Sequence, residues 1–172
     1  MGTTKSGRYF KTQGSGTTVG DYALVHSSEG TFTRPSRPGT NIRLLSGGHG
    51  QHSLNLLDKY GIKYNIVKEY ENGVRVGNIP THKDKRKRIG TGQAWFPKNW
   101  SDKDIRRAGD HVASLKENRH APDGKVLWGV YKGVRVGIIK TKGTPGTVFP
   151  DSDQSSVINK KNKNKNKRRK KK

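Results

Sequence analysis

Residues 62–80 read IKYNIVKEYENGVRVGNIP, two runs of β-forming residues joined by a turn signal. Asn72-Gly73 readily takes the positive φ angles of a tight hairpin turn, so the runs on either side predict paired antiparallel strands. Pro80 ends the second run, because proline has no N–H to donate to a neighbouring strand. The stretch therefore predicts a β-hairpin near the middle of the chain.

The flanking segments predict helices and further strands. Leucines at roughly helical spacing predict a helix near residues 50–60, which Gly61 ends. Apolar residues three to four apart predict an amphipathic helix over 102–115, and Ser101 with Asp104 resembles a capping box at its start. Three more β-like runs lie at 126–131, 134–140 and 147–149. The chain is thus expected to mix helices with hairpin-connected strands.

Composition divides the chain into three parts. Residues 1–40 are rich in Gly, Ser and Thr and predict a flexible leader, in which residues 22–25 form at most one short strand or turn. We expect the folded domain to span 41–153 and a disordered polybasic tail to span 154–172. Only 28% of residues are hydrophobic, so the core is expected to be small.

The charge of the chain indicates a polyanionic partner. It carries 36 Lys and Arg against 13 Asp and Glu, a formal net charge of +23. Ten of the cations lie in Asn159–Lys172, which leaves +13 on the rest. Phosphates relieve such self-repulsion, and counterion release makes the binding favourable. An anionic membrane surface could bind the positive charge of the chain in the same way. No apolar run in the sequence is long enough to span a bilayer. The absence of cysteine excludes disulfides, thiolate zinc sites and cysteine nucleophiles.

Histidines are the best candidates for proton transfer. Cleavage of RNA through its 2′-hydroxyl needs a base, an acid and a cation or donor on the developing charge. His49 follows Gly47-Gly48 at an expected helix start, and His82 opens a basic loop, although either is equally compatible with a plain surface residue. The others lie in the leader, on helix surfaces and in a loop: His26, His52, His111 and His120.

A metal site has less support. Acids are scarce, and a two-metal nuclease needs several clustered carboxylates. His49 and His52 are three residues apart, but no third ligand is obvious. We therefore expect no metal and no cofactor.

Two further patterns have a structural and a functional interpretation. Trp95, Phe96 and Trp100 could stack on bases, but we favour core packing for at least two of them. The pentapeptide Gly-Val-Arg-Val-Gly occurs at 73–77 and again at 133–137. Alternation along two strands with inward valines is the favoured interpretation, and arginines that face a common phosphate site are the weaker one.

Several motifs in order resemble the bacterial EndoU nuclease domain, which is found at the C-terminal end of polymorphic toxins and in phage-associated proteins. The resemblance covers about residues 40–153. The motifs are Gly47-Gly48-His49, the run GVRVGNIPTH at 73–82, GTGQ at 90–93, WFPKNW at 95–100 and GTVFPD at 146–151.

The resemblance implies a fold and a reaction. The fold would be a compact single α+β domain with helices packed on a twisted antiparallel sheet, a barnase-like ribonuclease architecture. The enzyme would be an RNA endonuclease, metal-independent or only metal-stimulated, that leaves 2′,3′-cyclic phosphate and 5′-hydroxyl ends. Its two catalytic histidines would match His49 and His82, and a catalytic hydroxyl would match Thr147.

The remaining site residues are less directly matched. The family's catalytic lysine has no unambiguous counterpart, and we expect Arg135 to supply the cation because its valine neighbours would hold it in the sheet. The other candidates are expected to bind substrate: Lys83, Lys132 and Lys140. Phe149 stands where the family often has tyrosine, and it is also expected to contact substrate.

These inferences define one main hypothesis and two alternatives. We expect a monomeric toxin effector that cleaves RNA, such as tRNA, and that is paired with an acidic immunity protein. It would be secreted or delivered into the cytoplasm of a target cell, as the C-terminal part of a larger toxin or as a phage-encoded protein. A non-catalytic basic RNA- or DNA-binding protein is the first alternative, and a metal-dependent nuclease is the second.

Overall fold

The computed structural model describes residues 13–34 and 41–159. Their strands form three antiparallel sheets, with strand orders β1-β2, β3-β4-β5 and β6-β7-β8. In chain order the elements are α1 (Asp21–Ser28), β1 (Thr31–Phe32), β2 (Leu44–Ser46), α2 (Gln51–Lys59), β3 (Asn65–Glu69), β4 (Arg75–Asn78), the 3₁₀ turn η1 (Lys85–Lys87), β5 (Gln93–Trp95), α3 (Asp102–Ser114), β6 (Val126–Tyr131), β7 (Val134–Thr141) and β8 (Thr144–Pro150). The expected compact α+β fold with antiparallel sheets is confirmed.

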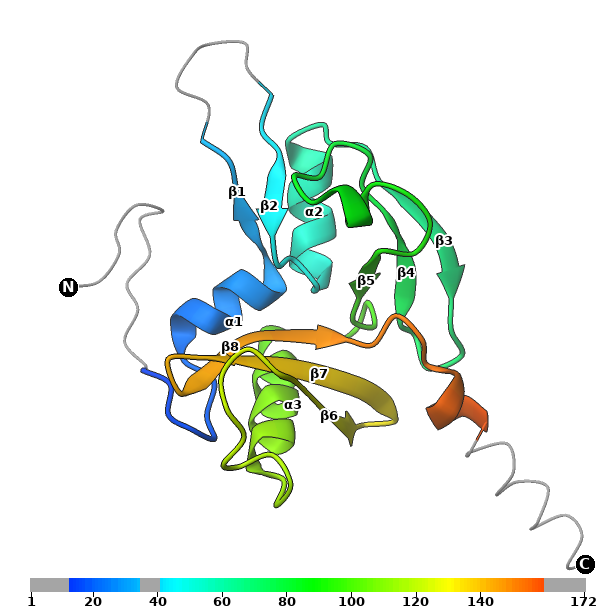
Figure 1. Cartoon of the computed structure of the whole chain (residues 1–172). Coiled ribbons are helices and arrows are strands. Elements are labelled where there is room, and N and C mark those ends of the chain that lie inside the picture. The colour runs from blue at the N-terminus through cyan, green and yellow to red at the C-terminus, as the bar shows by residue number, and fades with distance from the viewer. Residues whose placement is uncertain (1–12, 35–40, 160–172) are drawn as a thin grey trace, which may run out of the picture.

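The elements pack in two halves (Figure 1). In the lower half of the view, α3 packs against the sheet β6-β7-β8, and α1 lies beside β8. In the upper half, α2 and the sheet β3-β4-β5 lie together, and β1 and β2 lie beside α2. β5 contacts β8, so the two larger sheets meet near the middle of the molecule.

Two apolar clusters form the core. The larger joins α1 and α3 to the C-terminal sheet, and the smaller joins α2 to β2 and β5. The larger cluster includes the valines of both pentapeptides, Val74, Val76, Val134 and Val136, each at most 1% exposed. The interpretation of the repeat as two strands with inward valines is confirmed. Core packing is also confirmed for Trp95 and Phe96, which are fully buried.

Part of the expected leader belongs to the folded unit. Residues 21–28 form helix α1 rather than a short strand or turn. Ahead of it, the Val19 side chain is buried, its N–H donates to Asp110 Oδ1 (2.7 Å), and its carbonyl accepts from Arg106 (2.7 Å). These contacts attach residues 13–34 to α3, so the domain begins well before residue 41. Residues 1–12 lie outside the described part.

The C-terminal boundary also shifts slightly. Gln154 is fully buried, and its amide bonds to Asn72 Nδ2 and to the Arg135 backbone. Residues 155–159 are helical. The rest of the expected tail, 160–172, lies outside the described residues. Among the helices that are described, none has the length and apolar character needed to cross a membrane.

Candidate active site

The Gly47–Gly50 loop places His49 beside the end of helix α1. The N–H groups of Gly48, His49 and Gly50 donate to the carbonyls of three consecutive α1 residues, at 3.0, 2.6 and 3.0 Å. The acceptors are His26, Ser27 and Ser28. These carbonyls end a helix and would otherwise lack partners. The loop therefore holds His49 at a fixed position relative to α1.

Glycine is required in this loop by conformation and by space. Gly47 and Gly48 have φ angles of +69° and +76°, a region that side chains with a Cβ rarely adopt. A Cβ on Gly47 would lie 2.2 Å from the His26 carbonyl oxygen and 3.0 Å from Nε2 of the His26 ring. The close approach of the loop to His26 thus explains why Gly47 and Gly48 precede His49.

We expect Gly47→Ala to destabilise the protein and to impair the site, because the Cβ must push α1 away from the loop. The strained φ alone costs on the order of 1–3 kcal/mol. Chemical denaturation measures the loss. Gly133→Ala is the control, because it combines a similar φ of +74° with open space around the added Cβ. Equal losses in the two variants would contradict the role of the His26 contact.

The His49 ring is held in one tautomer. Its Nδ1 lies 2.8 Å from the Ala94 carbonyl oxygen, which only accepts, so Nδ1 carries the proton. Nε2 is left with a lone pair. Burial, followed by the charge of Lys87, lowers the pKa of His49 from 6.5 to about 3. His49 is therefore neutral near pH 7, with the lone pair on Nε2, and the Phe149 ring lies beside it at 5.9 Å between centroids.

His26 lies on the other side of the same loop. Its Nδ1 is 2.9 Å from Thr31 Oγ1, and burial together with the charge of Lys87 lowers its pKa. The Val148 N–H donates to Ser27 Oγ (2.8 Å), which fixes β8 against α1. As a result, His26 and Thr147 line one pocket of about 530 Å³, hereafter the His26 pocket.

Lys87 supplies the positive charge at this site. It ends η1, and its carbonyl accepts from the Ile79 N–H (2.9 Å). Burial lowers the pKa of Lys87 itself. Its charge in turn lowers the pKa values of His26, His49 and His82. A cation that acts on these rings can also stabilise negative charge that develops on a phosphate.

His82 is fully buried. Its Nδ1 accepts from the Asp84 N–H (2.8 Å), and its Nε2 is enclosed without a partner among the described residues. Its carbonyl accepts from Arg88 Nε (2.7 Å), and Arg43 Nη2 lies at 3.4 Å. Burial, then the charge of Lys87, lowers the pKa of His82 to about 4. The ring thus braces the loop that carries Lys87, whereas His26 lines an open pocket.

Three of the basic residues expected at the site pair with other groups of the protein. Arg135 pairs with Asp151, and its guanidinium lies 4.1 Å from the Trp128 ring centroid. Lys132 pairs with Asp104 (2.8 Å) at the start of α3. Lys140 is buried and donates to the carbonyls of Asn118 and Arg119 (2.9 Å each), which is a structural role.

Phe149 contacts His49, and Lys83 is exposed next to His82. Phe149 is half-buried between the rings of His49 and Trp128. Thr147 precedes Phe149 by two residues in β8, so both side chains lie on the same face of the strand.

Sequence reasoning missed two residues that the fold brings together with His49. His26 lies in a segment assigned to the leader, and Lys87 lies in a basic run in which neighbouring cations look alike. The Lys85 and Arg86 side chains are exposed, whereas Lys87 is half-buried. Gly92 packs closely against the η1 turn, because a Cβ at this position would lie 2.0 Å from the Arg86 carbonyl oxygen.

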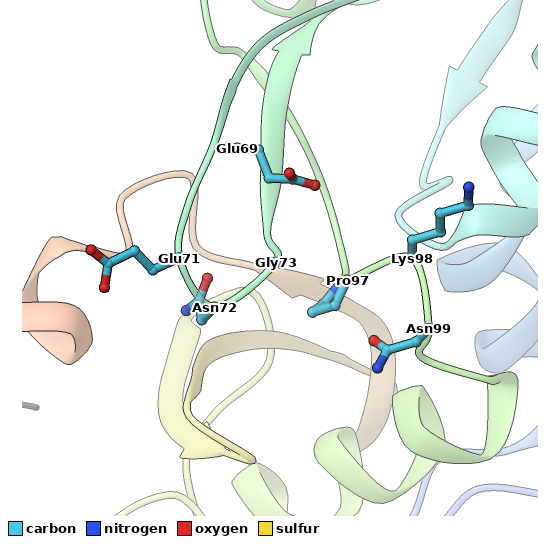
Figure 2. A pocket seen from close by; sticks show the side chains of 7 residues that line it. All are labelled: Glu69, Glu71, Asn72, Gly73, Pro97, Lys98 and Asn99. Carbon is cyan, nitrogen blue, oxygen red and sulfur yellow. The ribbon is translucent and has the colours of Figure 1, made fainter.

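A second depression of about 610 Å³ lies on the β3-β4 hairpin. Figure 2 shows Glu69 and Glu71 on its hairpin side and Pro97, Lys98 and Asn99 on the facing segment. Its two carboxylates disfavour phosphate, and no histidine lines it. Among the described residues, no group of three or more His, Asp or Glu side chains is arranged to hold a metal ion.

The lowered pKa values predict acid sensitivity. Histidines in the unfolded chain titrate near 6.5, so below that pH the unfolded state binds more protons than the folded state does. The free energy of unfolding should therefore fall from pH 6.5 towards 4, by about 1.4 kcal/mol per pH unit for each of His49 and His82. Urea denaturation at pH 7.5, 6.0 and 5.0 measures the slope, and a stability that stays constant over this range would contradict the burial of both rings.

Comparison with known proteins identifies the class of this protein as a nuclease. The family model for the bacterial EndoU nuclease matches residues 21–152, and the chain belongs to that family. The match includes α1 and His26 as well as the motifs from Gly47 onward. A nuclease function and a nucleic-acid substrate follow from this membership. No curated protein and no solved structure matches the chain.

Proposed function

We propose that the protein is an RNA endonuclease that cleaves by attack of the 2′-hydroxyl on the adjacent phosphate. The observation that carries this proposal is the contact of the His49 loop with the end of α1, where His26 and Thr147 line one pocket, together with the charge of Lys87 that acts on both rings. Such a set supplies a base, an acid, a cation and a hydroxyl. These are the groups that transesterification requires.

The first proton transfer is assigned to His49. Nε2 of His49 accepts the proton of the 2′-hydroxyl, and the 2′-oxygen forms a bond to phosphorus. The Nδ1–H bond to Ala94 O keeps the ring oriented while Nε2 gains the proton. Lys87 stabilises the charge on the non-bridging oxygens, and the Thr147 hydroxyl donates to one of them.

The second proton transfer is assigned to His26. As the bond from phosphorus to the 5′-oxygen breaks, protonated His26 donates to that oxygen. A bound phosphate favours the protonated ring, because an adjacent negative charge raises the pKa of histidine. The products carry a 2′,3′-cyclic phosphate and a 5′-hydroxyl. His82 acts indirectly, by holding the loop that carries Lys87.

We further propose that the protein is an effector toxin that acts in the cytoplasm of a target cell and that an acidic inhibitor silences it in its producer. The support is family membership together with the net charge of +23. Complementary charge speeds such association. Survival of cells that express the wild-type chain without an inhibitor would contradict this role.

Incubation with total RNA and with plasmid DNA in EDTA tests the catalytic proposal. The expected result on a gel is cleavage of RNA and intact DNA. A purely nucleic-acid-binding protein would leave both intact. A nuclease that depends on a divalent metal would become active only when that metal is restored.

A further inference from the structure

Arg75, the arginine of the first pentapeptide, is a buried cation. It begins β4, and only 5% of its surface is exposed. Among the described residues, both of its hydrogen bonds run to uncharged oxygen atoms, and its Nε is enclosed without a partner. Burial lowers the pKa of the guanidinium, and the charge of Glu69 counters this only in part. Burying a charge without an ionic partner costs stability, so folding stability alone does not explain an arginine at this position.

The arginine of the second pentapeptide has a different environment. Arg135 occupies the same position of the repeat, but it pairs with Asp151, and its side chain is 31% exposed. Its guanidinium also lies against the Trp128 ring. Arginine commonly has an ionic partner and some access to solvent. The repeat therefore sets one arginine in an ion pair and the other among neutral acceptors in the interior.

The two hydrogen bonds of Arg75 reach two different segments of the chain. Nη1 donates to Gln51 Oε1 (2.6 Å), and Nη2 donates to the Phe96 carbonyl oxygen (2.5 Å). Gln51 is the first residue of α2, and Phe96 directly follows β5. The guanidinium is planar and donates along fixed directions. One side chain therefore sets the distance between the start of α2 and the end of β5.

These two segments are the ones that hold His49. Gln51 follows His49 by two residues in the chain. On the other side, the Phe96 N–H donates to the His49 carbonyl oxygen (2.7 Å), and the Ala94 carbonyl accepts from His49 Nδ1 (2.8 Å). His49 is thus linked to both acceptors of Arg75, through the chain to Gln51 and through a hydrogen bond to Phe96.

We propose that Arg75 is a positioning residue for His49, because it holds α2 and the end of β5 at the distance that keeps the His49 ring bonded to Ala94. The proposal rests on the proposed proton transfer by His49 and adds a residue on which the geometry of that transfer depends. At 5% exposure the guanidinium is not available to a phosphate, so Arg75 acts through His49. A displacement of about 1 Å in a reacting group reduces a rate by about 10²-fold.

Cleavage of a labelled RNA in EDTA by three variants of the full-length protein tests this role. Arg75→Met keeps an apolar stem and removes both bonds, so it should reduce kcat by about 10–10²-fold and leave KM nearly unchanged. Arg75→Lys keeps the charge and a donor but not the planar fork, so it should recover part of the loss. Gln51→Ala removes only the bond to α2 and should give an intermediate kcat. It decides the same question if Arg75→Met does not fold.

Nitrogen NMR of the isotope-labelled histidine rings at pH 7 reports the position of His49 independently of activity. The wild type should show His49 as a single tautomer with the proton on Nδ1. Arg75→Met and Gln51→Ala should show a mixture of tautomers, because the ring is no longer held against the Ala94 carbonyl. The matched control is Lys140→Met, since Lys140 is also a buried cation that donates to two carbonyl oxygens, but away from His49. It should lose stability and keep both kcat and the His49 tautomer.

Two results would overturn the positioning role: a wild-type His49 tautomer in Arg75→Met, whatever its kcat, or equal effects on the tautomer in Lys140→Met. If the wild-type protein cleaves no RNA while Arg75→Met alters the tautomer, the nuclease proposal fails and the positioning role stands. If the wild type cleaves RNA and Arg75→Met keeps both its kcat and the tautomer, the reverse holds.

Discussion

His49→Ala should reduce RNA cleavage by about 10²–10⁴-fold, the usual contribution of a general base. The side chain holds the lone pair that the fold leaves at Nε2, and no other histidine has a ring bonded to β5 in this way among the described residues. Single-turnover cleavage of a labelled RNA measures the loss. The variant also leaves the Ala94 carbonyl without its partner, so a small decrease in stability accompanies it.

Two further variants separate chemistry from folding. His49→Asn keeps a side-chain N–H that can reach the Ala94 carbonyl, yet it has no basic nitrogen, so it should be as inactive as His49→Ala. His120→Ala removes an exposed loop histidine and should cleave like the wild type. Activity within a few-fold of wild type in His49→Asn would remove His49 from the proton transfer.

Lys87→Met should reduce kcat by about 10²–10³-fold, the range seen when one group that stabilises transition-state charge is removed. Methionine preserves the length of the half-buried stem and removes only the charge. The same change should raise the pKa values of His26 and His49, because the Lys87 charge lowers both. NMR titration of the histidine ring protons measures this second effect, which a merely structural lysine would not produce.

Neighbouring cations provide the controls for Lys87. Lys85→Met, in the same 3₁₀ turn but exposed, should change KM modestly and leave kcat near the wild-type value. Arg135→Met should lower stability, because it leaves Asp151 without its partner. If instead Arg135→Met abolishes kcat while Lys87→Met retains it, Arg135 is the catalytic cation, as the sequence alone suggested.

Much of the fold follows from local patterns. The 102–115 helix, its capping box and the strands at 126–131 and 134–140 agree with α3, β6 and β7 to within a residue or so. The start of β8 was missed, because Gly143 to Gly146 resembles a turn. β8 is an edge strand, and an edge tolerates Pro145 because the missing N–H is not needed for pairing.

Helix α1 was missed for a different reason. Its apolar residues do not repeat with a clear helical period, and it is stabilised by contacts with partners that are distant in sequence. These are the loop at 47–50, Ser27 to β8, and the pairing of Asp21 with Arg106. Such contacts leave no periodic pattern, so a short helix among Gly and Thr residues resembles a leader.

The candidate site was only partly predictable. Gly-Gly before His49 indicates a close backbone approach, which the structure explains, but the sequence does not say which segment approaches. His82 also looked like a loop residue, since the basic residues around it suggest solvent exposure. The structure buries its ring and half-buries Lys87 nearby. Which cation of a basic run faces inward is decided by the turn that carries it.

Cleavage of one RNA oligonucleotide in two forms, in EDTA, shows whether the 2′-hydroxyl is the attacking group. One form is unmodified, and the other carries 2′-O-methyl groups at every position, which removes the attacking hydroxyl. We expect that only the unmodified RNA is cut and that mass spectrometry finds 2′,3′-cyclic phosphate and 5′-hydroxyl ends. Cleavage of the methylated RNA, or products with 5′-phosphate ends, would contradict the proposed chemistry of His49, His26 and Lys87.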